Sequence, residues 1–164
     1  MEGHKLAINR IAQPFSDTPR DFKVNYKAAE KFLQFLDAGT HNFCFRTYDD
    51  NKNRKDRTLS KNFYGTFKQH KDALTKNNKM GASVCVIINL GGHSDPEIEK
   101  IRFVFADTDG APARPLFEAL RPHAIVQSSL KKFHIYWRVT EFPLERFTSV
   151  QKAIAMKYDT DNVI

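Results

Sequence analysis

The spacing of apolar residues along the chain predicts alternating helices and strands. Residues 26–37 carry apolar side chains three and four positions apart, which indicates an amphipathic helix. Residues 82–90 are almost wholly apolar and rich in β-branched side chains, as a central strand is. The same criteria predict helices over 65–77, 113–121 and 143–157, and strands over 41–47, 100–107, 123–129 and 133–140.

The order of these elements is typical of an α+β fold. In such a fold a mostly antiparallel sheet has helices packed on it. We expect one domain over residues 1–164, in which residues 1–24 form an irregular lead-in because prolines and aspartates interrupt them. The polar residues 49–56 are expected to form a mobile loop between a strand and the next helix.

Composition and cysteine content limit the class of protein. Of 164 residues, 41% are hydrophobic and 12% aromatic, which indicates a folded chain and not a disordered one. No apolar run approaches the roughly 20 residues that cross a bilayer, and the polar N-terminus has no signal-peptide core. Cys44 and Cys85 are too few for a disulfide framework or a zinc site, so we expect reduced core residues. These features predict a cytoplasmic protein with no membrane partner.

Basic residues are concentrated in one segment that also carries aromatic rings. The net charge of +7 and the pI near 9.4 favour a polyanionic partner. Cations next to stackable rings, here Phe63, Tyr64 and Phe67, suit a single-stranded nucleic acid. A solvated loop followed by an ordinary amphipathic helix explains the segment equally well. The candidate nucleic-acid-binding residues are Lys52, Arg54, Lys55, Arg57 and Lys61.

Two aspartates, Asp107 and Asp109, lie at the end of the strand expected over 100–107. Strand alternation would point both carboxylates the same way, and they would repel each other unless a cation lay between them. Magnesium and manganese prefer such hard oxygen ligands, so the pair is a candidate site for Mg²⁺ or Mn²⁺. Taken alone, so short a pattern is better explained as a strand that ends in an Asp-Gly turn.

The segment 128–138 is expected to form a hairpin whose second strand has two different faces. One face is an apolar core stripe of Phe133, Ile135, Trp137 and Val139. The other face and the turn offer the imidazole, hydroxyl and ammonium groups that a triphosphate requires. A sheet face that is merely solvated would alternate in the same way. The polar residues are Ser128, Ser129, Lys131, Lys132, His134, Tyr136 and Arg138.

A second acidic pair, Asp159 and Asp161, follows the helix expected over 143–157. Either carboxylate could complete a metal site with the first pair. Both residue types are also common in the turn after a helix, and the residues alone favour that explanation.

In their order, these segments resemble the archaeo-eukaryotic primase superfamily, and above all the RepB-like primase domains of plasmids, phages and mobile elements. Such domains carry a Gly-Ala-Gly-Val strand, an aromatic-rich strand ending in Asp-Leu-Asp-Gly, and a Ser-Ser-Pro-Gly-Lys-Tyr-His-x-Tyr-Trp hairpin. The resemblance spans roughly residues 60–164. It outweighs the explanation of Asp107 and Asp109 as a simple turn, and that of the polar hairpin face as merely solvated. The matching stretches are 81–89, 103–110, Pro122-His123, 128–137, and Phe147 with Gln151.

The resemblance implies an RRM-like catalytic core of a DNA primase or primase-polymerase that works by two-metal nucleotidyl transfer. It implies that Asp107, Asp109 and Asp161 hold Mg²⁺ or Mn²⁺, with Asp159 as an alternative third ligand. The catalytic residues would be these three aspartates and His134. The nucleotide-binding residues would be Ser128, Ser129, Lys131, Lys132, His134 and Arg138.

The implied partners are a single-stranded DNA template, nucleoside triphosphates and, as an open question, a replicative helicase. At the hairpin turn this chain departs from the family, because Leu130 and Lys131 stand where relatives have proline and glycine. Relatives also continue with an Arg-Val-x-Arg-Leu-Pro-Gly stretch. We therefore expect this chain, which stops at Ile164, to be truncated at its C-terminus and of unsettled activity.

Two other functions are compatible with these residues. A non-catalytic module for single-stranded nucleic acid, or an inactive primase remnant, would use the acidic residues as turns. A rolling-circle replication initiator needs two histidines around a hydrophobic residue on one strand, plus a nucleophilic tyrosine. The stretch His134-Ile135-Tyr136 offers one histidine, which argues against that function.

Overall fold

The computed structural model describes residues 6–7 and 22–161 of the chain. The chain divides into two compact units: unit 1 comprises residues 1–12 and 101–164, and unit 2 comprises residues 13–100. The lead-in expected over residues 1–24 lies mostly outside the described residues. That residues 1–164 act as one domain stays a prediction.

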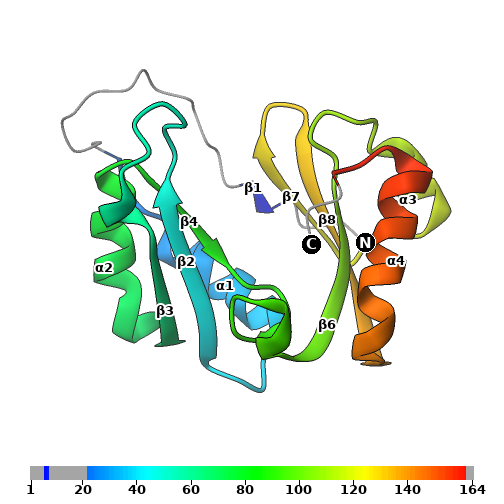
Figure 1. The fold of residues 1–164 in the computed structure, drawn as a ribbon, viewed down its shortest axis with the longest axis horizontal. Coiled ribbons are helices and arrows are strands. Elements are labelled where there is room, and N and C mark those ends of the chain that lie inside the picture. Colours follow the sequence, from blue (N-terminus) through cyan, green and yellow to red (C-terminus); the bar gives the residue numbers. More distant parts are fainter. Residues whose placement is uncertain (1–5, 8–21, 162–164) are drawn as a thin grey trace. The chain divides into compact units, whose positions relative to one another are not determined.

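Unit 2 is built on a three-stranded antiparallel sheet in the order β3-β2-β4 (Figure 1). The helix α2 packs on one face of this sheet. There the ring of Phe67 lies 6.1 Å from that of Phe45, and Nδ2 of Asn77 donates to Oγ1 of Thr47 at 3.2 Å. The elements are α1 (Tyr26–Leu36), β2 (Asn42–Asp49), a 3-10 helix (Arg57–Leu59), β3 (Lys61–Thr66), α2 (Phe67–Lys79), β4 (Ala82–Val86), β5 (Leu90–Gly91) and a second 3-10 helix (Asp95–Glu97).

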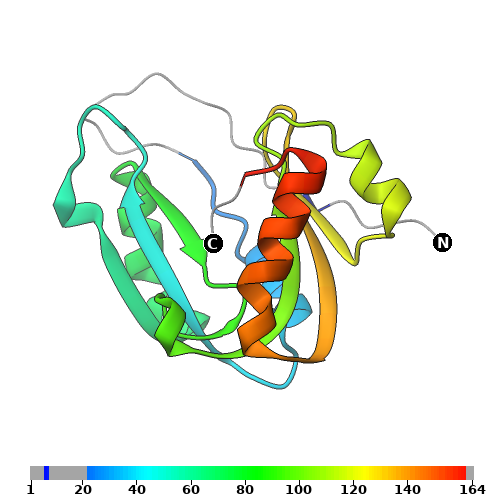
Figure 2. The same ribbon diagram turned by 45° about the vertical axis from the view of Figure 1, so that its right-hand side comes forward.

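Unit 1 contains strands in the order β1-β7-β8-β6, all antiparallel except the β1–β7 pair. The first residues of β6, Ile98 and Lys100, belong to unit 2 and pair there with β5. Figure 2 shows α4 lying along the strands of unit 1. The elements are β1 (Leu6–Ala7), β6 (Ile98–Asp107), α3 (Arg114–Ala119), β7 (Ala124–Ser129), β8 (Lys132–Phe142) and α4 (Leu144–Tyr158).

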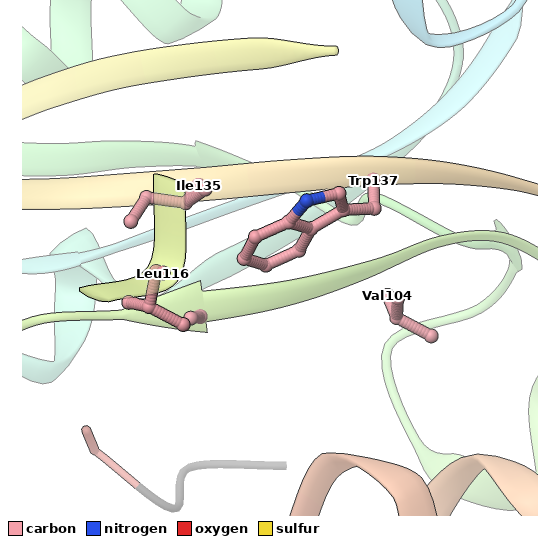
Figure 3. Packing of buried hydrophobic residues seen from close by; sticks show 5 residues of the cluster. Val104, Leu116, Ile135 and Trp137 are labelled. Carbon is pink, nitrogen blue, oxygen red and sulfur yellow. The ribbon is translucent and has the colours of Figure 1, made fainter. Parts of the chain in front are cut away.

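The core of unit 1 lies between its sheet and its two helices (Figure 3). Ile135 and Trp137 project from β8 and Val104 from β6, and Leu116 of α3 packs against them. Trp137 also donates from Nε1 to the carbonyl of Leu120 at 3.0 Å, which satisfies its only polar atom. The apolar stripe predicted for β8 is therefore confirmed.

The α+β class and the mostly antiparallel pairing are confirmed, but one strand was placed wrongly and another was not predicted. The segment 82–90 is not one central strand, because β4 ends at Val86 and lies at an edge of its sheet. The central strand is β2. Strand β3 was missed because its sequence, Lys-Asn-Phe-Tyr-Gly-Thr, is too polar to show alternation. The capping box of Thr66 and Gln69 then starts α2.

Two predictions on membrane and redox class can be compared with the structure. No helix within residues 22–161 is long and apolar enough to cross a membrane. Both cysteines are thiols: Cys44 is buried, whereas Cys85 is only partly buried, so the prediction of a core residue is wrong for Cys85.

Candidate active site

Asp107 and His134 face each other on neighbouring strands of unit 1. The antiparallel register of β6 and β8 places the two residues directly opposite each other. Oδ2 of Asp107 lies 3.1 Å from Nε2 of His134, and their side chains are 35% and 38% exposed. Because directly opposed side chains in an antiparallel pair are close neighbours, the register alone brings the two groups together.

The imidazole of His134 is held at both nitrogens. The hydroxyl of Tyr136 lies 3.3 Å from Nδ1 of His134, while Nε2 faces Asp107. Tyr136 is itself fixed, because it is buried and its ring packs 6.2 Å from that of Phe103 and 6.4 Å from that of Phe105. A neutral ring in this position donates from Nε2 to the carboxylate and accepts at Nδ1 from the tyrosine hydroxyl.

The pKa of Asp107 reflects two opposing influences. Burial, the largest single influence, raises the pKa of this carboxyl, but the hydrogen bond and the charge of His134, together with the N–H of Asp109 and the charge of Lys132, outweigh it. The backbone N–H of Asp109, which donates to Oδ1 of Asp107 at 3.1 Å, acts in the same direction as His134. The net result is a pKa below the ordinary aspartate value, so the carboxylate is ionised at neutral pH.

Asp109 lies beyond the end of β6, in a turn. Thr108 is buried and pairs with Phe133 of β8, donating through its N–H and accepting at Oγ1, both at 3.0 Å. Asp109 and Gly110 then have φ values of 33° and 107°, and a type I′ turn requires positive φ at both positions. The expectation that strand alternation orients Asp109 is therefore wrong, because the turn places its carboxylate.

Lys132 is the hairpin residue that reaches Asp109. Its ammonium pairs with Oδ1 of Asp109, and this contact raises the pKa of Lys132. The turn before it places Lys131 at φ 61°, so a lysine adopts the left-handed conformation at the position where the resemblance leads us to expect glycine. Oγ of Ser128 donates to the carbonyl of Lys132 at 3.4 Å, and Ser129 pairs with Lys132 in the ladder.

Arg138 is not brought to this site. It lies opposite Phe103 in the ladder, and its guanidinium carbon lies 5.3 Å from the centre of the Phe103 ring. Four residues of strand separate it from His134, which corresponds to about 13 Å. Strand alternation placed His134 and Arg138 on one face, but the prediction did not take into account how far apart they lie along the strand.

Asp161 joins the site through its backbone. Its N–H donates to the carbonyl of Asp107 at 2.8 Å in an isolated antiparallel bridge. Asp159 instead closes α4 in the left-handed conformation. Beside this bridge is a hollow of about 570 Å³, lined by Thr108, Asp109, Gly110, Ala111, Pro112, Asp159, Thr160 and Asp161. Of the two candidates for the third ligand, Asp161 is therefore the one whose backbone is bonded to Asp107.

Gln151 of α4 is a positioning residue that was not among the predicted site residues. Its side chain is buried, accepts from the N–H of Phe105 at 3.1 Å and donates to the carbonyl of Phe105 at 3.2 Å. It therefore fastens α4 to β6 two residues before Asp107. A buried amide on an apolar helix face is the signal that could have identified it, because such a group needs a partner.

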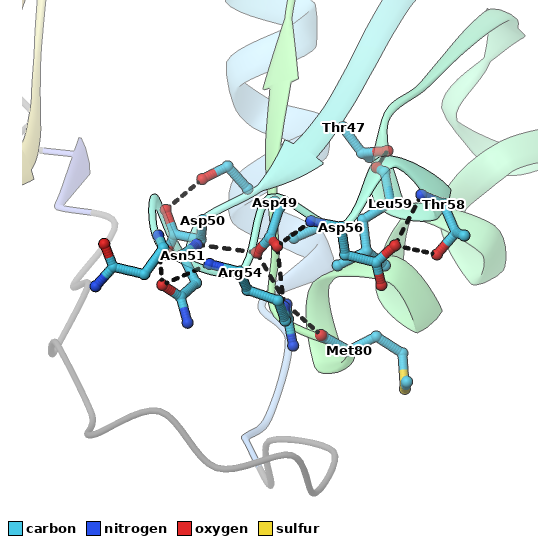
Figure 4. A network of polar contacts seen from close by, with 12 residues as sticks. Thr47, Asp49, Asp50, Asn51, Arg54, Asp56, Thr58, Leu59 and Met80 are labelled. Carbon is cyan, nitrogen blue, oxygen red and sulfur yellow. Dashed lines mark hydrogen bonds and ion pairs between the residues drawn. The ribbon is translucent and has the colours of Figure 1, made fainter.

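The basic segment of unit 2 holds one of its five candidate cations in a structural role. Arg54 donates to both oxygens of Asp49 from Nε and Nη2, each at 2.9 Å, and to the carbonyl of Met80 at 3.1 Å (Figure 4). This bidentate pair engages the guanidinium that was predicted to bind nucleic acid. The remaining candidates are exposed: Lys52, Lys55, Arg57 and Lys61.

The oxygen donors of the site suit a hard divalent ion. Within the described part of the chain, no group of three or more His, Cys, Asp and Glu side chains is arranged to hold a metal. Magnesium, however, is commonly held by one or two carboxylates together with substrate phosphates. Asp107 and Asp109 provide two such carboxylates, so this pair of residues fits Mg²⁺ or Mn²⁺.

Comparisons with known proteins bear on the same segment. Residues 94–164 match the RepB DNA-primase N-terminal domain. The chain resembles a RepB-like archaeo-eukaryotic primase. The fold of the chain is similar to the AEP domain of the primase-polymerase of cyanophage S-2L, with a TM-score of 0.61 and 21% identity over 81% of this chain and 73% of that one. A comparison with curated proteins found no match. The matched segment contains Asp107, His134 and Asp161.

Proposed function

We propose that the chain is the catalytic core of a DNA primase or primase-polymerase, which joins nucleotides on a single-stranded DNA template. The observation that carries the proposal is the Asp107–His134 pair, whose side chains lie 3.1 Å apart inside the segment that matches the RepB primase domain. The carboxylate has a lowered pKa and is ionised, and the Nε2–H of His134, which faces this carboxylate, would become available to a phosphate oxygen if Asp107 held a metal ion instead.

Each residue then has a role that follows from its position. Asp107 and Asp109, with Asp161 beside them, hold Mg²⁺ or Mn²⁺. The ion, when bound, neutralises phosphate charge and lowers the pKa of the attacking hydroxyl. His134 would then donate from Nε2 to the phosphates of the incoming nucleotide, while Tyr136 at Nδ1 fixes the orientation of its ring. Lys132 adds positive charge on the side of Asp109.

A specific observation favours a second candidate, a non-catalytic module that binds single-stranded nucleic acid. Asp107 and Asp109 are each paired with a side chain of their own chain, His134 and Lys132. Such pairs are also what purely structural acidic residues form. A module of this kind would bind DNA without any dependence on a divalent ion.

Manganese binding and dinucleotide synthesis separate the two candidates. We expect Asp107→Asn and Asp109→Asn to abolish Mn²⁺ binding, followed by electron paramagnetic resonance, and dinucleotide synthesis on an oligonucleotide template. Glu145→Gln, which removes an exposed carboxylate from the first turn of α4, is the matched control and should retain both. Manganese affinity that is unchanged in the Asp107→Asn/Asp109→Asn double variant would refute the primase proposal.

A further inference from the structure

The sheet of unit 2 has one face that lies away from α2. Phe45 and Thr47 point toward that helix, so alternation puts Arg46 and Tyr48 on the opposite face of β2. The register adds Tyr64 to this face, opposite Cys44 in the ladder. Tyr48 is 43% exposed and Tyr64 is 53% exposed, and Arg46 is exposed between them.

The ring of Tyr64 is held in place although its surface is open. Its hydroxyl lies 2.8 Å from Nδ1 of His93, and the two rings are 6.5 Å apart. Cys44 is buried next to it in the ladder. An exposed ring that is already fixed loses little conformational entropy when a ligand stacks on it, which favours binding.

The three flat groups of this face follow one another along the sheet. Arg46 and Tyr48 are two residues apart on β2, a distance of about 6.6 Å in a strand, and Tyr64 is opposite the residue two positions before Arg46. Beyond Tyr48 the chain enters the loop that carries the exposed cations Lys52 and Lys55. Two rings and a guanidinium therefore form one track on this face, and the loop with the two lysines follows it along the chain.

We propose that this face of the β3-β2-β4 sheet is a stacking platform for single-stranded DNA, with unpaired bases on Tyr64, Arg46 and Tyr48. Phosphates beyond Tyr48 then pair with Lys52 and Lys55. The proposal deepens the proposed function and rests on it, because it names the surface that holds the template strand. Tyrosine rings and arginine planes bind every base through its face, so the platform binds single strands with little sequence preference.

The charges of unit 2 match this occupant. The acidic side chains at the ends of the track are bonded within the chain: Asp49 to Arg54, Asp50 to the hydroxyl of Ser83, and Glu97 to Ser94. The chain as a whole carries a net charge of +7. A face that combines stackable rings with an exposed arginine suits a polyanion with unpaired bases better than an apolar partner protein, which would need aliphatic contacts.

The test is binding of a fluorescently labelled dT20 oligonucleotide, measured by anisotropy at several salt concentrations. We expect Tyr48→Ala and Tyr64→Ala each to weaken binding about tenfold, and Tyr48→Phe to retain it because the ring remains. Arg46→Gln should weaken binding and reduce the salt dependence by about one phosphate contact. Lys68→Gln is the matched control, because it removes one charge from the exposed side of α2.

An oligonucleotide of the same length with abasic sugars separates stacking from charge. The proposal predicts that Tyr48→Ala and Tyr64→Ala no longer differ from the wild-type protein on this probe. It is overturned if the wild-type protein does not bind dT20, or if the folded tyrosine variants bind dT20 as the wild type does. Manganese binding that depends on Asp107, found together with either result, would leave the primase proposal intact and remove only the platform. An altered oligomeric state of the folded tyrosine variants, with unchanged dT20 binding, would assign the face to a second copy of the chain.

Discussion

The carboxylate of Asp107 and the imidazole of His134 are joined across two adjacent strands, with Oδ2 and Nε2 3.1 Å apart. The resemblance assigns these residues to different tasks, one to the metal and the other to the triphosphate. The β6–β8 register places the two residues next to each other on the sheet. A change in either side chain should therefore be detected at the other.

The first prediction concerns the pKa of Asp107. Its lowered pKa means that the ionised carboxylate stabilises the fold above the unfolded-state pKa, roughly 3.9, and that this contribution is lost as pH falls through the folded-state pKa. His134→Ala removes the bond and the charge but leaves the burial, so the pKa of Asp107 should rise. Carboxyl ¹³C NMR titration measures this shift. His123→Ala is the control, since His123 accepts from the N–H of Arg138 instead. An unchanged Asp107 titration in His134→Ala would contradict the prediction.

The second prediction separates stability from function at Lys132. The side chains of Lys132 and Asp109 are 46% and 57% exposed, so solvent screens their pair and Lys132→Met should leave the free energy of unfolding close to that of the wild type. If Lys132 provides charge for the triphosphate, the same variant should bind a nucleoside triphosphate about tenfold more weakly. Thermal unfolding and titration calorimetry measure the two effects. Lys152→Met, on the exposed side of α4, should change neither. Equal triphosphate affinity in both variants would remove Lys132 from the site.

The sequence predicted correctly those elements in which the spacing of apolar residues is repeated over a long stretch. Strand β8 showed its apolar stripe over seven residues, and α4 its helical spacing over fifteen. Strand β3 could not be predicted, because half of its six residues are Lys, Asn and Thr and its pairing with β2 depends on distant residues. The edge position of β4 is likewise a property of the sheet, which apolar composition does not encode.

The sequence identified residues of the site but not how these residues are arranged. Asp107 and His134 were named from their motifs, but their contact depends on the β6–β8 register, which neither motif specifies. Asp109 was assigned to a strand face because alternation was extended two residues too far. Gln151 was left out of the site because its amide, although it lies on an apolar helix face, had no partner until the packing of α4 on β6 brought it to the backbone of Phe105.

The third prediction is that Gln151 stabilises unit 1 more than its polarity suggests. Gln151→Leu would leave the N–H and carbonyl of Phe105 without the amide that satisfies them, which should cost about 1–3 kcal/mol of unfolding free energy. Urea unfolding can be followed by the fluorescence of Trp137, the only tryptophan of the chain and a core residue of the same unit. Lys152→Leu, the exposed neighbour on α4, is the control. Equal stability of the two variants would show that the amide contacts contribute little.

The fourth prediction divides the basic segment of unit 2 into a structural residue and ligand-binding ones. The carboxylate of Asp49 is almost fully buried and accepts from Nε and Nη2 of Arg54 at 2.9 Å and from the N–H of Asp56 at 2.7 Å. These bonds, led by the Arg54 guanidinium, hold the pKa of Asp49 well below its usual range. Its stabilising contribution is therefore present above pH 4 and is lost only in strong acid.

Arg54→Gln should accordingly destabilise unit 2 by about 2–3 kcal/mol, because it leaves the Asp49 carboxylate without its charged partner. Lys55→Gln should leave the free energy of unfolding unchanged and weaken binding of a dT20 oligonucleotide, since this lysine is exposed. Urea unfolding and fluorescence anisotropy, applied to both variants, measure the two quantities. If Arg54→Gln were as stable as the wild type and lost affinity for dT20 as Lys55→Gln does, the guanidinium would belong to the DNA-binding surface and not to the fold.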